Sequence, residues 1–181
     1  MVSLDLTLDA YQPFDAIEDG HRHALLDLLR NTAAPYSRNQ FDPGHVTASC
    51  FIVDPEGRLL LHHHRRLDRW LQMGGHLEAG EEPAAAALRE GTEESGLHDL
   101  HLHDGIADLD VHVIPAGKGE PLHRHFDVRY IARTALPDAI AVDVTESRGL
   151  MWFDLQRAAE RMAGEESLRV IQKIGRLLAC R

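Results

Sequence analysis

Three glutamates, Glu90, Glu93 and Glu94, stand three and four residues apart in the sequence. In a helix such positions are neighbours on one face, because each residue advances by about 100° around the axis. Three like charges on one face repel one another and destabilise an isolated helix. A bound cation would remove that repulsion, and a ligand set made only of oxygens suits Mg²⁺ or Mn²⁺ rather than zinc. The spacing therefore predicts a metal site for phosphate chemistry.

The segment from Gly75 to Leu97, GHLEAGEEPAAAALREGTEESGL, resembles the Nudix box, the signature of the Nudix hydrolases. That pattern consists of a glycine, five residues, a glutamate, seven residues, Arg-Glu, a hydrophobic residue, any residue, Glu-Glu, any residue, a glycine and a hydrophobic residue. The matching residues are Gly75, Glu81, Arg89, Glu90, Glu93, Glu94, Gly96 and Leu97. Gly91 departs from the pattern, because it stands where the family has a bulky hydrophobic residue.

The resemblance implies an activity and a cofactor. In Nudix hydrolases water attacks a phosphorus of a nucleoside diphosphate that is linked to another group, and Mg²⁺ or Mn²⁺ assists the reaction. By resemblance, the metal ligands are the carboxylates of Glu90, Glu93 and Glu94 and the carbonyl oxygen of Gly75. The same three glutamates are candidates for the general base.

Arg89 completes the predicted catalytic group. It can reach Glu93 one helical turn further on and hold that carboxylate in place. Glu81 has two open interpretations, as a partner of Arg89 or as an acidic residue that suits the positive end of the helix. Outside the box, Glu120, Asp127 and Glu146 are further candidates for the general base. Glu120 ranks first because its loop joins two strands that are expected to flank the cleft.

A second polar cluster is predicted on those two strands, residues 106–114 and 123–135. Side chains two apart share a face of a strand, so one face carries Asp108, Asp110 and His112, and one face of the next strand carries His123, His125 and Asp127. If the strands pair as a hairpin, the polar faces coincide and can bind a metal or phosphate. The alternative is a solvated face on which histidines bond to aspartates, and the register decides between the two.

Two residues nearer the box are also candidates for substrate contact. His76 follows Gly75 and is predicted to touch phosphate or a metal-bound water. Arg65 resembles a position where many family members carry a basic residue, although a solvated edge strand is the alternative. The residues predicted to bind substrate are thus His76, Arg65, His112, Glu120, His123, His125 and Asp127.

The elements that must position these residues follow from hydrophobic periodicity and from turn residues. The predicted helices are 15–31, the box helix ending at Gly96, 155–162 and 166–180; the predicted strands are 45–53, 58–66, 106–114, 123–135 and 150–153. The turn at 54–57 predicts a hairpin of the first two strands. This order forms no regular βαβ units and fits an α+β fold with a mixed sheet between helices. The resemblance implies the same α/β/α sandwich, as one domain with a helical extension at 1–44 and a Nudix core at 45–181.

Composition limits the partners. The formal net charge of -10 argues against broad binding to nucleic acid, which needs a basic surface. No stretch approaches the length of a membrane span, and the first twenty residues lack the pattern of a secretory signal, so we expect a cytoplasmic protein without membrane contact. The expected partner is a small nucleotide-type substrate. A homodimer is suggested only by analogy with the family.

Two alternatives to the magnesium-dependent hydrolase remain. One is a catalytically silent module that uses the same pocket to sense a nucleotide or metabolite. Loss of a box carboxylate would favour it, and none is lost. The other makes the histidine patch the main site, with a transition metal that performs the hydrolysis there.

Overall fold

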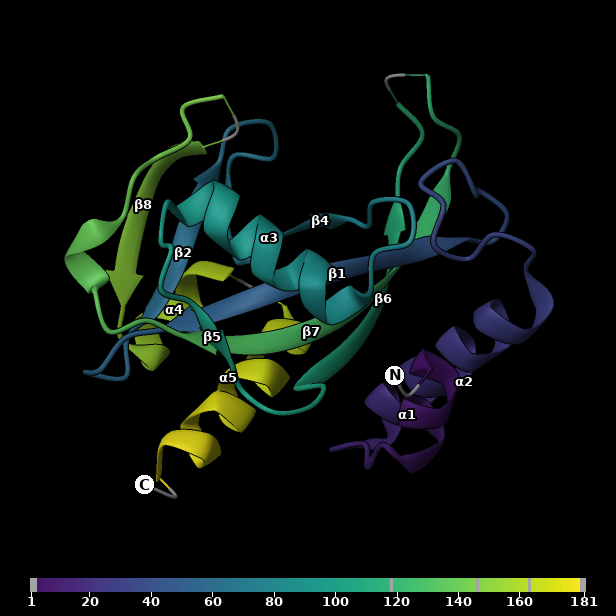
Figure 1. Cartoon of the computed structure of the whole chain (residues 1–181), viewed down its shortest axis with the longest axis horizontal. Coiled ribbons are helices and arrows are strands. Elements are labelled where there is room, and N and C mark those ends of the chain that lie inside the picture. Colours follow the sequence, from purple (N-terminus) through teal and green to yellow (C-terminus); the bar gives the residue numbers. More distant parts are fainter. Residues whose placement is uncertain (1–2, 118, 146, 163, 180–181) are drawn as a thin grey trace.

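The computed structural model describes residues 3–117, 119–145, 147–162 and 164–179 and shows one mixed β-sheet between layers of helices (Figure 1). The helices are α1 (Leu4–Ala10), α2 (Ala16–Asn31), α3 (Pro83–Ser95), α4 (Leu155–Met162) and α5 (Glu165–Ala179). The strands are β1 (Gly44–Val53), β2 (Leu59–His64), β3 (Arg69–Leu71), β4 (Met73–His76), β5 (His101–Leu102), β6 (Asp108–Ile114), β7 (His123–Arg133) and β8 (Ser147–Phe153).

The centre of the sheet is the pair of strands β1 and β7, which run parallel from Gly44 opposite Arg124 to Val53 opposite Arg133. Each of these long strands has two antiparallel neighbours on its other side. Strand β1 pairs first with β4 and then, at its end, with β2. Strand β7 pairs first with β6 and then with β5. Strands β3 and β8 extend the sheet beyond β2.

Alternate residues of β1 supply the two hydrophobic cores. Ala48 and Cys50 belong to the core under α3, whereas Phe51 and Val53 belong to the core under α4 and α5. This is the alternation expected of a strand that is buried on both faces. In Figure 1, α3 lies in front of the sheet and α4 and α5 lie behind it. The predicted α/β/α sandwich is confirmed.

Helix α2 lies beside the edge strand β6, together with α1 (Figure 1). It starts at Asp15, whose carboxylate accepts a hydrogen bond from the backbone N–H of Glu18 at 2.8 Å. Such an N-cap satisfies one of the free N–H groups at the start of a helix. Leu25 and Leu28 on its inner face are buried in the same core as α3.

The elements predicted from the sequence are present, with shifted ends. The hairpin of β1 and β2, the antiparallel pair of β6 and β7, and the helices α2 and α4 agree with the sequence analysis. The strand predicted at 58–66 is wrong at its C-terminal end, because β2 ends at His64 and Arg65 lies in an exposed turn. Helix α1 and strands β3, β4 and β5 were not predicted. Within the described residues, no helix has the length and apolar character needed to cross a membrane.

Candidate functional site

The box consists of strand β4, a loop, and helix α3, which packs on the sheet. Gly75 faces α3, and a side chain there would collide with the carboxylate of Glu90. Gly96 ends the helix with a φ of 75°, in the left-handed region that glycine adopts readily. The helix itself begins at Pro83, so Glu81 belongs to the loop and not to the first turn.

Arg89 joins the loop to the helix. Its Nε and Nη2 donate to the two carboxylate oxygens of Glu81, each at 3.0 Å. Its Nη1 donates to Glu90 at 3.0 Å and to Glu93 at 3.1 Å, and Nη2 also reaches the backbone oxygen of His76 at 3.0 Å. The guanidinium holds the pKa of Glu81 below its ordinary value. Glu81 therefore pairs with Arg89, and this resolves its two open interpretations.

The three box glutamates differ in exposure. Glu94 is buried, and its carboxylate accepts a hydrogen bond from the backbone N–H of Gly74 at 2.9 Å. Glu93 lies at the surface with 59% of its side chain exposed, and Glu90 lies between these extremes at 16%. Glu94 also lies near the buried thiol of Cys50, whose pKa burial raises to about 12 with a smaller contribution from Glu94. That thiol stays protonated and is not a nucleophile.

The chemistry of these side chains suits a divalent cation. The carboxylates around Arg89 carry more negative charge than its one guanidinium offsets. All the atoms that could bind a metal are oxygens, which are the ligands that Mg²⁺ and Mn²⁺ prefer. The missing side chain at Gly75 lets the Glu90 carboxylate approach the loop backbone. Glu90, Glu93, Glu94 and the Gly75 carbonyl are the groups that could hold the ion.

The histidines gather on the other face of the sheet. His76 lies opposite Thr47 on β1, two residues from His45 and on the same face. His125 on β7 lies directly opposite His45. One ligand nitrogen from each of His45, His76 and His125 lies within 4.8 Å of the other two. His123 stacks on His45, with ring centroids 5.2 Å apart.

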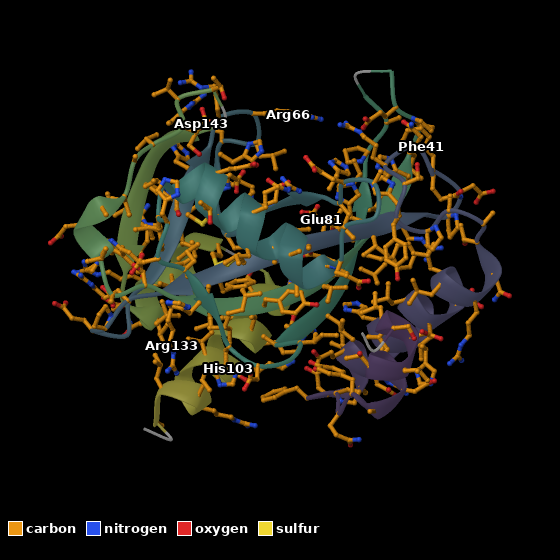
Figure 2. All side chains as sticks on the ribbon, viewed as in Figure 1. Phe41, Arg66, Glu81, His103, Arg133 and Asp143 are labelled. Atoms are coloured by element: carbon orange, nitrogen blue, oxygen red, sulfur yellow. The ribbon has the colours of Figure 1, made fainter. Side chains whose placement is uncertain are left out.

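Burial governs the charge of these imidazoles. It lowers the pKa of His45, and it lowers the pKa of His76 to about 4 and that of His125 to about 2. The ring of Phe41 covers His123 edge-on at a centroid distance of 5.1 Å. Figure 2 shows Phe41 beside the loop that joins β6 to β7. Burial therefore favours the neutral form of His45, His76 and His125.

Strands β6 and β7 pair as the hairpin that the sequence analysis considered, and the register that it left open does not give a simple polar patch. His112 lies opposite His125, and Asp110 lies opposite Asp127. Arg129, which the sequence analysis did not consider, inserts between the aspartates and donates to Asp127 at 2.9 Å, to Asp110 at 2.9 Å and to Asp108 at 3.2 Å. All four residues are buried. The aspartates thus belong to an internal ion-pair network.

The prediction that Asp127 contacts the substrate does not agree with its position in the structure. It is 2% exposed, and it accepts hydrogen bonds from Ser49 at 2.8 Å and from Thr47 at 3.2 Å in addition to the Arg129 pair. A carboxylate with these partners is not available to a substrate or as a general base. Burial likewise places His123, at 2% exposed, inside the molecule rather than on a substrate surface.

The remaining candidates lie near the surface. The carboxylate of Glu120 lies 3.5 Å from the guanidinium of Arg38. His112 is 44% exposed, bonds to Asp110 at 2.9 Å, and lines a cavity of about 460 Å³ beside α2 and α5. Arg65 is exposed in the β2–β3 turn, and its neighbour Arg66 extends outward there (Figure 2). Glu146 lies outside the described residues.

Sequence reasoning missed His45 as a member of the histidine cluster. Its position at the start of β1 makes it a neighbour of His125 only through a parallel register. The signal that was available is that His45 is the first residue of the predicted strand 45–53, in a chain with 13 histidines. Pairing of the strands, and not spacing in the sequence, brings these residues together.

Known proteins are similar to this chain in sequence and in fold. A family model described as NUDIX domain matches residues 43–174. The structure is similar to an Ap4A hydrolase from C. elegans (TM-score 0.63, 22% identity, 75% of this chain and 98% of that chain) and to a NUDIX-family hydrolase from Clostridium perfringens (TM-score 0.56, 27% identity, 74% and 97%). It is also similar to the E. coli dihydroneopterin triphosphate pyrophosphohydrolase (TM-score 0.59, 22% identity, 72% and 95%).

One curated protein, an octanoyltransferase from Myxococcus xanthus, is 36% identical over 127 residues. The match covers 66% of this chain but only 34% of that protein. The chain therefore spans about a third of the length of this relative.

Proposed function

The chain belongs to the Nudix hydrolase family, and from this premise we propose that it hydrolyses a phosphoanhydride bond in a nucleoside diphosphate linked to another moiety, with Mg²⁺ or Mn²⁺. The observation that carries the proposal is the set of contacts around Arg89. One guanidinium holds Glu81, Glu90 and Glu93 together, and the Gly74 N–H holds Glu94. These contacts arrange the carboxylates before any substrate arrives.

Each box residue has a proposed role. When bound, the cation would offset the negative charge of the diphosphate and lower the pKa of a bound water. Glu90, Glu93, Glu94 and the Gly75 carbonyl would hold it. Arg89 keeps the loop and the helix at a fixed separation, so the attacking water and the phosphorus meet in a fixed orientation. The general base is one of the box glutamates, and Glu93, the most exposed of them, is best placed to meet a substrate.

The substrate class comes from similarity alone. Two structural neighbours are named for the hydrolysis of Ap4A and of dihydroneopterin triphosphate. Their identity to this chain is 22%, so they guide only the choice of test compounds. The panel contains nucleoside triphosphates, dinucleoside polyphosphates, ADP-ribose, sugar nucleotides, NADH and coenzyme A.

The test is a hydrolysis screen of this panel with Mg²⁺, in which chromatography of the products detects turnover and locates the cleaved bond. We compare the wild-type protein with Glu93→Gln and Glu94→Gln. We expect the wild type to hydrolyse one class of compound and the variants to lose turnover by at least about 100-fold, because each removes a charge that holds the cation. Addition of EDTA should abolish the activity.

The matched control is Glu82→Gln. Glu82 is an exposed carboxylate directly before α3, and its side chain makes no capping hydrogen bond. It should keep wild-type turnover. Near-normal turnover of Glu93→Gln and Glu94→Gln would refute the assignment of the metal site. A wild type that binds panel compounds in a thermal-shift assay but cleaves none of them would favour the silent sensor.

A further inference from the structure

The histidine cluster has the donor geometry of a metal centre. His45, His76 and His125 come from three different strands, and the strand pairing places all three on one face of the sheet. Their ligand nitrogens already lie within 4.8 Å of one another. Around a tetrahedral zinc ion with Zn–N bonds of about 2.0–2.1 Å, nitrogens lie about 3.4 Å apart. The nitrogens would therefore have to approach one another by up to about 1.4 Å to bind the ion.

Two hydrogen bonds fix which nitrogen is available. Nδ1 of His45 lies 2.9 Å from the backbone oxygen of Gln40, and Nδ1 of His123 lies 2.8 Å from that of Pro121. A carbonyl oxygen can only accept, so each Nδ1 must carry the hydrogen. In a neutral ring Nε2 then presents a lone pair. A backbone carbonyl that orients the ring in this way is the usual outer partner of a histidine metal ligand.

Those lone pairs are buried without a partner. Nε2 of His45 and Nε2 of His123 have no hydrogen-bond partner among the described residues, and the two residues are 1% and 2% exposed. A buried polar atom without a partner costs free energy, on the order of 1–3 kcal/mol. Binding of a cation would remove this cost.

From this geometry we propose that His45, His76 and His125 bind a first-row transition-metal ion, Zn²⁺ in particular. The ring of His123 lies beside this site, with its centroid 5.2 Å from those of His45 and His125. Imidazole ligands suit zinc, copper, nickel and iron, whereas Mg²⁺ prefers oxygens. A phosphate suits this site less than a cation does, because Nε2 of a neutral His45 can only accept a hydrogen bond and the unprotonated oxygens of phosphate also only accept. The cluster therefore selects a cation of a different class from the box.

The proposed centre is separate from the box, but the two sites contain consecutive residues of strand β4, Gly75 and His76. Gly75 faces Glu90 on the α3 side of the sheet, and the next residue, His76, faces the other side. The backbone oxygen of His76 also accepts a hydrogen bond from Arg89. A metal bound by His76 would hold the box loop in place from behind.

The experiment is a titration of tag-free protein with Co²⁺ in the presence of excess Mg²⁺, which occupies the carboxylates. Co²⁺ bound to three or four imidazoles gives visible absorption bands, and displacement by Zn²⁺ then reports the affinity for zinc. We expect one equivalent of Co²⁺ to bind and Zn²⁺ to displace it. We also expect Zn²⁺ to raise the thermal unfolding temperature in the same buffer.

The variants are His125→Ala and His76→Ala, because these two residues are only half-buried. Loss of one ligand should weaken Co²⁺ binding by more than about 100-fold, since loss of an outer partner alone typically costs 10- to 100-fold. The matched controls are His103→Ala, which removes an exposed histidine outside the cluster, and Glu93→Gln, which alters the box. Both controls should bind one equivalent as the wild type does.

Three results would overturn the proposal. The first is the absence, in the wild-type protein, of both the Co²⁺ absorption bands and a Zn²⁺-dependent rise in the unfolding temperature. This result does not depend on any variant. The second is unchanged Co²⁺ binding in His125→Ala and His76→Ala. The third is loss of the spectrum in Glu93→Gln, which would place the ion in the box. None of these readouts requires hydrolysis, so a failure here is distinct from a failure of the proposed function.

Discussion

Arg89 and Gly75 show how single residues shape the box. Arg89 contributes a side chain that reaches four groups, and Gly75 contributes the absence of one. The two features are complementary, because the guanidinium holds the Glu90 carboxylate at the place where a side chain on residue 75 would otherwise stand. Both residues could be identified from the sequence. Gly75 matches the Nudix box, and Arg89 lies one helical turn before Glu93, so their contact involves only local chain geometry.

We predict that Gly75→Ala lowers kcat/KM by about 100-fold or more on the compound that the screen identifies. The added methyl group would displace Glu90, and a shift of about 1 Å in a catalytic group is enough for such a loss. Steady-state kinetics and a urea unfolding curve measured together check this. Gly149→Ala is the control, because a side chain there meets no atom within 4 Å. Equal kinetics for the two variants would contradict the role of Gly75.

A second residue-scale prediction concerns pH and His62. This residue is 2% exposed and hydrogen-bonded to Ser147 at 2.7 Å, and burial, with smaller effects of His64 and His63, lowers its pKa from 6.5 to about 4. Below pH 6.5 the unfolded chain therefore takes up a proton that the folded chain does not. The free energy of unfolding should fall by about 1.4 kcal/mol per pH unit between pH 6.5 and 4 from this group.

Urea midpoints measured at pH 7, 6 and 5 test this against His62→Gln. The wild type should lose more stability on acidification than the variant does. His103→Gln, at an exposed histidine, should follow the wild type. Parallel pH curves for the wild type and His62→Gln would show that His62 does not titrate as expected.

At the scale of elements, close contact between α3 and β1 explains the departure at Gly91. A Cβ atom there would lie 3.0 Å from the sulfur of Cys50 and 3.2 Å from Leu100. The bulky residue of the family pattern has no room in this chain. Glycine destabilises a helix by about 1 kcal/mol relative to alanine. At residue 91 the absence of a side chain allows α3 to pack closely on the sheet.

We predict that Gly91→Leu lowers the free energy of unfolding by about 1–3 kcal/mol, because it overpacks a filled core. Gly20→Ala in α2 is the matched change at an exposed helical glycine with open space around it. It should raise stability by up to about 1 kcal/mol. Both values come from denaturant unfolding. A neutral or stabilising Gly91→Leu would mean that α3 can move away from β1.

Elements with a strong local pattern were predictable, and those defined by pairing were not. Helices α2 and α4 and the β1–β2 hairpin have periodicity and turn residues of their own. Helix α1 has seven residues, and strands β3, β4 and β5 have two to four, which is too short for a period to emerge. The histidine cluster depended on β4, and so His45 and His76 could not be placed beside His125 from the sequence.

At the scale of the whole molecule, one buried network ties both ends of the chain to the sheet. Glu18 on α2 is 0% exposed and accepts hydrogen bonds from Tyr11 at 2.6 Å and from the backbone of Leu109 at 3.1 Å. It also forms an ion pair with Lys173 on α5, which lies 2.9 Å from Asp108 on β6. The N-terminal helices are thereby joined to the core rather than attached loosely to it.

We predict that Glu18→Ala destabilises the protein by about 3–5 kcal/mol, because it leaves the buried ammonium of Lys173 with one partner fewer. Asp19→Asn, which weakens a partly exposed ion pair with Arg22 on the same helix, should cost no more than about 1 kcal/mol. Chemical denaturation measures both. Equal losses would show that the network contributes no more than a surface pair.

The parallel pairing of β1 with β7 also sets the order in which the chain can fold. Gly44 pairs with Arg124, a separation of 80 residues in the sequence, and the whole box lies in the connection between the two strands. Closing a long loop costs entropy that is recovered only when the distant strand arrives, so folds rich in such contacts form slowly. During synthesis, the hairpin of β1 and β2 and the helix α3 emerge before β7 is available. One edge of the central strand β1 therefore stays unpaired until synthesis has passed Arg133, the last residue of β7.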